Sequence, residues 1–408
     1  MAHYNSVHID AMRPKLHSLD WLQDKLGGSE PLEPHTFPVN DGFKLVIPGD
    51  WAKHADQEVV PGASICTAHN GTEYPLTKAA ILEAGALGGI PRDHAQKVLP
   101  SLFEQETNWW MQEGLGDISF KLLKDAGGTV LGVTRATINP FSNLALLDEL
   151  VNGLRRKYGE GAELLVDYKT HHDLELTNFR LIVPGDVRVI TGSRIADDTW
   201  STGINFRNSL IGLKPPQLDG YLFRWWCTNG CYDTMSTMTA PRRQIKDQAD
   251  AIEWAKFAVD EVLGGLETTL DGVQELTGIP VEGDVAVVLS DLFVQHGVPK
   301  AERTRVLNSM ADLGGELNMY DVQNAITSAA NMDGLSPRTV DILLSTGGHV
   351  AHANTGRCAA CRRILPEGYV IPGQQTGEAA AGAAELHTHL PPESGMDTQA
   401  AQDNGIIG

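Results

Sequence analysis

Hydrophobic and polar residues alternate through residues 200–232 of the chain. A period of two predicts strands, because successive side chains of a strand point to opposite faces of a sheet. Pro215 and Pro216 interrupt the pattern, since a proline pair cannot continue a ladder of backbone hydrogen bonds. The stretch closes on Asn229-Gly230, which is typical of a tight turn. It therefore predicts a strand, a loop, a second strand and a turn.

A similar eight-residue sequence occurs at residues 43–50 and again at residues 179–186. Both copies run from Phe through a basic residue, Leu and two β-branched residues to Pro-Gly-Asp. Each therefore predicts a strand that is closed by a Pro-Gly turn. The flanks match poorly, so we interpret the copies as two similar β-turn units, with a chance match as the alternative.

Two other regions have helical spacing. Residues 75–114 predict three short helices, the first of them capped by Thr77. Residues 247–344 predict a longer series, whose last helix begins at Pro337 after the cap Ser336. We therefore predict an α+β fold in which a central, mainly antiparallel sheet is flanked by two helical regions, with a small zinc knuckle near the C-terminus.

The chain also divides by composition. Residues 372–408 are rich in Gly, Ala, Gln, Pro and Thr and lack the apolar spacing that a core requires. We expect an N-terminal arm at 1–40, an α+β core domain at 41–246, a helical region at 247–350, a Cys/His zinc knuckle at 351–390 and a disordered tail at 391–408.

The chain as a whole is acidic. Its 408 residues carry a formal charge of −20, which argues against a protein that coats DNA over its whole surface. Residues 171–246 differ, with nine Lys and Arg against seven Asp and Glu, and so permit a local nucleic-acid site. The five cysteines are irregularly spaced, and we find no apolar run of membrane-spanning length and no signal peptide. These features predict a soluble, cytoplasmic protein with no membrane partner.

Arginines and aromatic rings are mixed in the central strands. Surfaces that bind single-stranded nucleic acid combine cations that contact phosphate with rings that stack on bases. The candidate phosphate contacts are Arg180, Arg207 and Arg224. An ordinary sheet whose arginines extend their charged heads into water has the same composition.

The period of two decides which ring can act beside an arginine. On an unbulged strand Trp226 shares a face with Arg224, so we expect Trp226 to be the stacking residue. The opposite, core-facing set is Phe206, Tyr221 and Phe223. Nucleic-acid binding requires Arg224 and Trp226 to be exposed. A purely structural role predicts a buried Trp226 and an Arg224 that is paired with a carboxylate.

Cys358-x-x-Cys361, followed by two arginines and a Gly-bearing hairpin, is typical of a zinc knuckle. A thiolate pair at this spacing can bind one tetrahedral ion and needs two further ligands. His387 and His389 are the preferred pair, because the hairpin can return the chain toward the cysteines. The sequence therefore predicts a structural zinc site.

Several alternatives stay open. His349 and His352, upstream of the cysteines, are the other candidate pair, and free thiols or a redox pair would also explain the motif. A catalytic thiolate at Cys227 would need a histidine, and residues 171–173 offer one. We find no nucleotide-binding, metalloprotease or serine-hydrolase motif, so the sequence favours a non-enzymatic protein and leaves an enzyme open.

Arg-Trp-Trp-Cys-Thr-Asn-Gly at 224–230, preceded by Asn-Ser-Leu-Ile-Gly at 208–212, resembles the central signature of an uncharacterised family of phage- and plasmid-borne proteins. That family is catalogued as domain of unknown function nine-three-two. The similarity continues in order through residues 75–110, 132–150 and 320–350. It implies a mobile-element setting and no activity, because the family has none to carry over. The Trp225-Trp226 pair and Cys231 depart from the pattern.

Together these features predict a phage- or plasmid-type accessory protein of DNA metabolism. It would bind single-stranded nucleic acid in order to anneal or protect it, would act in the host cytoplasm if phage-encoded, and would form a homo-oligomer. One alternative is a non-catalytic scaffold or interaction protein that acts through its acidic helical half. An uncharacterised enzyme is the second alternative.

Overall fold

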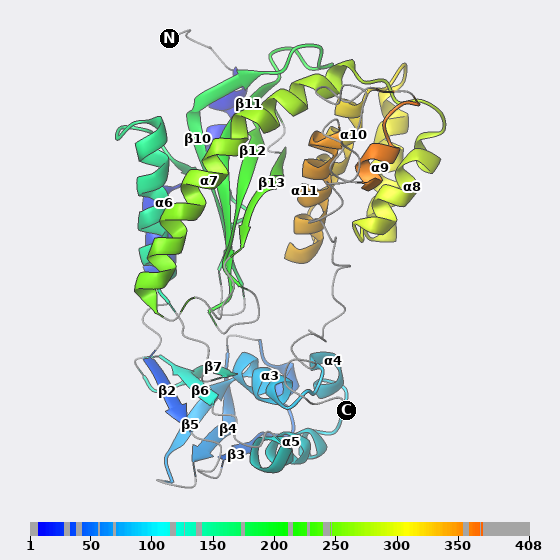
Figure 1. The fold of residues 1–408 in the computed structure, drawn as a ribbon. Helices are drawn as coiled ribbons and strands as arrows, with labels where there is room; N and C mark the ends of the chain where they lie inside the picture. Colours follow the sequence, from blue (N-terminus) through cyan, green and yellow to red (C-terminus); the bar gives the residue numbers. More distant parts are fainter. Residues whose placement is uncertain are drawn as a thin grey trace, which may run out of the picture.

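The computed structural model confirms the α+β class (Figure 1). Two sheets, each with its own hydrophobic core, account for the strands of the described residues. None of the helices described is both long enough and apolar enough to cross a membrane. The structure describes residues 7–27, 33–37, 43–55, 58–67, 71–114, 120–125, 127–135, 141–172, 176–210, 215–226, 229–239, 245, 247–353, 359–367 and 369.

The smaller unit is a six-stranded sheet in the order β2-β6-β7-β5-β4-β3, and its described residues also form three α-helices, a 3-10 turn at Trp51–Lys53 and a π-helical turn at Trp110–Gly114 (Figure 1). Its strand pairs are antiparallel except β5 with β7. Thr77 caps α3 as predicted, by accepting a hydrogen bond from the backbone N–H of Ala80. The elements are β2 (Glu33–Phe37), β3 (Phe43–Val46), β4 (Val59–Thr67), β5 (Glu73–Thr77), α3 (Lys78–Leu87), α4 (Arg92–Ala95), α5 (Pro100–Trp109), β6 (Phe120–Lys124) and β7 (Val130–Arg135).

Helix α5 covers the edge strand β3 with two polar side chains. Asn108 donates from Nδ2 to the carbonyl of Leu45 at 2.8 Å and accepts from the N–H of Leu45 at 2.7 Å. Glu104 accepts from the N–H of Ile47 at 2.9 Å. Side chains of a helix thus satisfy backbone groups that a neighbouring strand would otherwise bond.

The larger unit is a seven-stranded sheet in the order β1-β8-β10-β11-β12-β13, with β9 also paired to β10. The long helix α7 packs on β12 and β13, and α11 packs on β13. Its strands are β1 (His17–Ser18), β8 (Leu165–Val166), β9 (His171–His172), β10 (Thr177–Val189), β11 (Thr199–Asn208), β12 (Gln217–Arg224) and β13 (Asn229–Thr239). Its helices are α1 (Val7–Met12), α2 (Leu19–Gly27), α6 (Asn143–Tyr158), α7 (Gln248–Glu275), α8 (Val285–Gln295), α9 (Lys300–Leu313), α10 (Met319–Ala329), α11 (Pro337–Ala351) and α12 (Ala359–Arg363).

The central pattern forms antiparallel strands, as predicted. Strands β11 and β12 pair in continuous register, and β12 pairs with β13. The predicted position of the turn is wrong, because Asn229 and Gly230 already pair with Arg224 and Phe223. The chain therefore reverses before Asn229.

The two Pro-Gly sequences behave differently. At residues 43–50 the strand ends, and the N–H of Trp51 donates to the carbonyl of Pro48 at 3.3 Å, as a turn requires. At residues 179–186 the predicted turn is wrong, because β10 continues to Val189. The register with β11 shifts between Ile182 and Val187, which places Pro184-Gly185 in a bulge. A proline without an N–H is tolerated there because the ladder is already interrupted.

The domain boundaries differ from those expected. The range 41–246 contains strands of both sheets and residues of two hydrophobic cores, while β1 and β2 lie before it. Helices of residues 247–350 share one core with the larger sheet, through residues such as Leu266 and Leu344. Within the expected arm at 1–40, Leu22 and Leu26 are fully buried in that same core. A sheet with one unpartnered apolar face buries it against helices from any part of the chain, so sequence order does not mark the units.

Candidate functional site

Three potential metal ligands meet in the helical half of the larger unit. His296 follows α8, His349 lies in the last turn of α11, and Cys361 lies in α12. Their ligand atoms all lie within 4.8 Å of one another. Ligand atoms around a tetrahedral zinc ion are about 3.5 Å apart, given bonds of about 2.0–2.3 Å. Small side-chain movements would therefore bring all three onto one ion.

The surrounding packing places these side chains. The rings of His296 and His349 lie with their centroids 4.3 Å apart. Helix α11 begins where it was predicted, with Ser336 accepting from the N–H of Thr339. Cys361 is fully buried, in a helix that contacts α8. The group is therefore half-enclosed, with the sulfur as its innermost member.

The structure changes the predicted ligand set. Cys361 belongs to the group, whereas Cys358, His387 and His389 lie outside the described residues. Of the alternative pair, His349 joins the group and His352 does not. His296 was missed, because it lies far upstream of the Cys-x-x-Cys motif and no spacing connects the two.

The first of the predicted phosphate contacts, Arg180, is buried, with its side chain only 2% exposed. Its guanidinium lies 3.4 Å from Asp167 and 3.6 Å from Asp341, and donates to the Tyr232 hydroxyl at 2.7 Å. Tyr232 in turn donates to Asp341 at 2.7 Å. Burial raises the pKa of the Tyr232 hydroxyl, so it stays a neutral donor.

Arg207 and Arg224 are also paired with carboxylates. Arg207 contacts Asp219 at 2.5 Å. Arg224 donates from Nε and Nη2 to the two oxygens of Asp198, at 2.7 and 2.5 Å, and from Nη1 to Asn324 at 2.7 Å. Because an unpaired buried cation is costly, the fold supplies each guanidinium with an anion.

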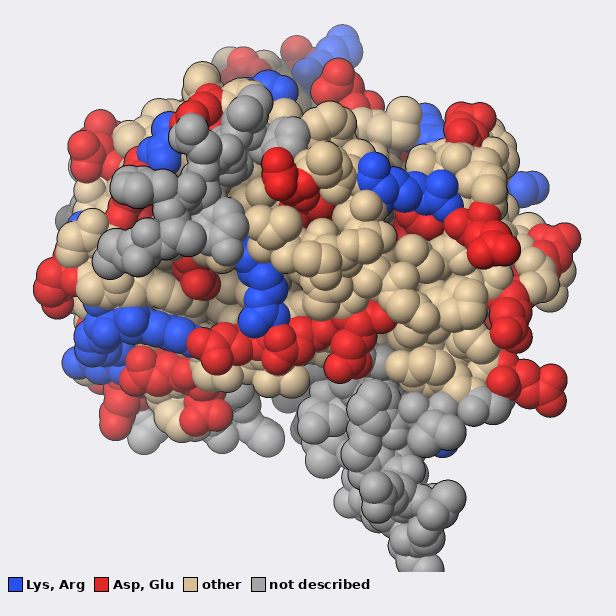
Figure 2. Space-filling view, turned by 90° about the horizontal axis from the view of Figure 1, so that it is seen from above, with Lys and Arg blue, Asp and Glu red and all other residues tan. Residues whose placement is uncertain are grey.

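The expected exposure of Arg224 is therefore wrong, and a phosphate would have to displace Asp198 to reach it. Figure 2 shows one face of the molecule, on which the described Lys and Arg residues lie in small groups bordered by Asp and Glu. The described residues of that face form no continuous basic track of the kind that follows a nucleic-acid backbone.

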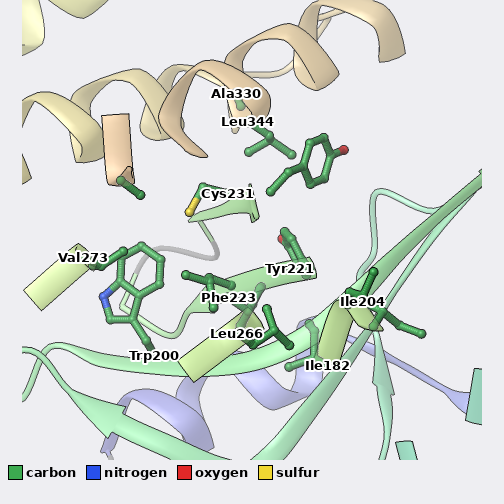
Figure 3. Close-up of a cluster of buried hydrophobic side chains, with 14 of the residues drawn as sticks. Ile182, Trp200, Ile204, Tyr221, Phe223, Cys231, Leu266, Val273, Ala330 and Leu344 are labelled. Atoms are coloured by element: carbon green, nitrogen blue, oxygen red, sulfur yellow. The ribbon is translucent and has the colours of Figure 1, made fainter. Parts of the chain in front are cut away.

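Both faces of β12 are covered, so burial does not alternate along it. Phe206, Tyr221 and Phe223 are buried as predicted, but Leu222 and Arg224 on the opposite face are buried too. Figure 3 shows Tyr221 and Phe223 among core side chains that include Leu266 of α7. Trp226, in contrast, is 44% exposed just beyond β12. Arg224 is therefore paired, as a purely structural role predicts, whereas Trp226 is exposed, as nucleic-acid binding requires.

The enzyme alternative depended on Cys227 and residues 171–173. Cys227 and Asp173 lie outside the described residues. The Nδ1 atom of His172 lies 2.8 Å from the Thr177 hydroxyl, within hydrogen-bonding distance. The described part of the chain therefore places His172 against a threonine of β10.

Comparisons with protein-family models, curated proteins and solved structures find no match to this chain. The resemblance to the phage and plasmid family accordingly stays a prediction.

Proposed function

We propose that this chain is an interaction protein whose acidic helical half is fastened by one structural zinc ion. His296, His349 and Cys361 would bind the ion, with Cys358 as the fourth ligand. The observation that carries the proposal is the convergence of three ligand atoms, from α11, from α12 and from the residue that follows α8, to within 4.8 Å.

The donor set favours zinc. Imidazole nitrogen and thiolate sulfur suit zinc, whereas magnesium and calcium prefer oxygen ligands. Two histidines and two cysteines would fill a tetrahedral shell and leave no open position for a substrate. Such a closed site stabilises structure, because its binding energy is available only to the folded protein.

Among the described residues, α12 is held by the burial of Cys361 and Ile364 in the core and by one ion pair to α8. Asp291 of α8 and Arg363 of α12 form an ion pair at 3.3 Å, but both side chains are 68% exposed. Exposed pairs of this kind contribute about 0–1 kcal/mol. A zinc ion bound to α8, α11 and α12 would hold these segments far more firmly.

The charge of this half indicates the kind of partner. Residues 247–350 hold 17 Asp and Glu against five Lys and Arg. Such a surface favours a protein partner with a basic face, through charge complementarity that speeds association and disfavours acidic competitors. The homo-oligomer predicted from the sequence would form through other contacts and stays a prediction.

Metal analysis tests the zinc site. Protein purified without chelator should contain about one zinc per chain, and Cys361→Ser, His296→Ala and His349→Ala should each lower that content. Cys66→Ser, in β4 of the smaller unit, is the matched control and should keep the metal. Absence of zinc from the wild type would refute the proposal. If Cys361→Ser and His387→Ala lose zinc and His296→Ala keeps it, the histidine ligands are His387 and His389, as the sequence predicted.

We propose single-stranded nucleic-acid binding as a second candidate function, now centred on Trp226 and no longer on the three arginines. The exposed indole supports it. The mobile-element and cytoplasmic setting belongs to the same proposal. Fluorescence anisotropy with single-stranded oligonucleotides at two salt concentrations tests it, since electrostatic contacts weaken as salt rises. No affinity at low salt would refute this candidate.

A further inference from the structure

Trp226 lines a pocket at the end of β12, where the sheet meets α9 and α10. The cavity has a volume of about 180 Å³. Sites for drug-sized ligands span about 300–1,000 Å³, so this one suits a single ring-sized group. The lining residues that matter here are Arg224, Trp226, Ser309, Tyr320, Asn324 and Ser328.

The cations beside the pocket are already neutralised. Arg224 is bound to both oxygens of Asp198, and Nε of Arg194 lies 3.1 Å from both oxygens of Asp321. The charges of the two arginines are therefore balanced by those of two carboxylates. An isolated phosphate or carboxylate would gain little there, and a neutral group fits better.

The side-chain amide of Asn324, a lining residue, has a defined orientation. Its Oδ1 accepts from Nη1 of Arg224 at 2.7 Å. Because a guanidinium only donates, this contact fixes the amide so that its NH₂ group is the other end. Ser309 and Ser328 also line the cavity, and both residues are exposed. The pocket thus combines a stacking ring with amide and hydroxyl groups that can bond the edge of a flat ligand.

We infer that this pocket binds one unpaired nucleobase, stacked on Trp226 and hydrogen-bonded along its edge by Asn324. Proteins hold unpaired bases by this combination of an aromatic face and polar side chains at the base edge. The inference rests on the second proposed function and names the group that the site would recognise. Base stacking of this kind does not require a basic track, which the described residues of the face in Figure 2 do not form.

Two variants and one matched control test the assignment. Trp226→Ala should weaken binding of a single-stranded oligonucleotide about five- to 150-fold, the range expected for one lost base–aromatic stack. Asn324→Ser should weaken it less and change the preference among homopolymers, because it alters hydrogen bonding to the base edge. Trp109→Ala removes an indole that is 54% exposed in the smaller unit and should leave affinity unchanged. Thermal unfolding of each variant checks that the fold is kept.

Two kinds of ligand separate this inference from the function on which it rests: an oligonucleotide that lacks a base, and nucleosides that lack the phosphate backbone. An abasic oligonucleotide of equal length should bind more weakly than the base-containing one, and free nucleosides should compete with it. If the wild type binds oligonucleotides and Trp226→Ala binds them equally well, the pocket assignment is wrong and nucleic-acid binding stands. If neither oligonucleotides nor nucleosides bind, both are wrong. Binding of a tyrosine- or tryptophan-containing peptide in place of nucleosides would also overturn the assignment.

Discussion

The buried pair of Arg224 and Asp198 allows a quantitative test of the electrostatics. Asp198 is fully buried and accepts two hydrogen bonds from Arg224, one from Tyr320 at 2.6 Å and one from Ser193 at 2.5 Å. Burial raises the pKa of the Tyr320 hydroxyl, which therefore remains a donor. Asp198→Asn keeps the volume and removes the charge that balances the guanidinium.

The expected cost follows from the burial of Arg224, whose side chain is 6% exposed. Removing one partner of a buried pair leaves an uncompensated charge, which costs about 3–5 kcal/mol. Asp198→Asn should therefore lower the free energy of unfolding of the larger unit by that amount. The double variant Asp198→Asn/Arg224→Met should cost less than Asp198→Asn alone, because it buries no unpaired charge.

Urea unfolding followed by tryptophan fluorescence measures the change, since Trp200 and Trp225 are buried in the larger unit. Asp291→Asn is the matched control, because its ion pair with Arg363 is exposed and should contribute at most about 1 kcal/mol. If Asp198→Asn costs no more than Asp291→Asn, the sheet does not depend on this counterion and the reasoning fails.

Three further predictions concern stability. Burial lowers the pKa of Lys169 to about 8, so between about pH 8 and 10.5 the unfolded chain binds more protons than the folded chain. The free energy of unfolding should therefore rise with pH in this range, compared with Lys169→Met. Identical pH profiles of unfolding for the two proteins would contradict this. Gly203→Ala would place a Cβ 2.0 Å from the carbonyl oxygen of Leu181, so it should destabilise the larger unit strongly, and an unchanged unfolding midpoint would show that β10 and β11 can separate there. Truncation after Leu390 should change the free energy of unfolding by no more than about 0.5 kcal/mol, and a larger loss would show that residues 391–408 dock on the body.

Local patterns in the sequence were enough to predict local structure. The period of two predicted the strands but not their burial, because both faces of β11 and β12 are covered. The caps Thr77 and Ser336 were found because a cap acts on residues three positions away. The two failed turns show the limit of this reasoning. A Pro-Gly or Asn-Gly pair permits a turn, but pairing with the neighbouring strand decides whether the chain turns there.

The candidate sites were only partly predictable, because their contacts join distant parts of the chain. Arg180 and Arg207 are of a residue type that commonly contacts phosphate. Nothing near them in the sequence indicates that Asp341 of α11 would lie beside both. His296 was missed for the same reason, since only the packing of α8 against α12 brings it to Cys361. Residue types suggest a chemistry, and the fold determines which groups meet.

The polar side chains on α5 have a consequence for self-association of the smaller unit. An edge strand with open backbone groups can be extended by a strand from another molecule, which leads to fibrillar aggregates. Asn108 and Glu104 occupy backbone groups of Leu45 and Ile47 from within the same chain. An incoming strand would first have to displace α5, so growth of the sheet from β3 is disfavoured. We therefore expect Asn108 to disfavour aggregation through β3 by means of hydrogen bonds alone.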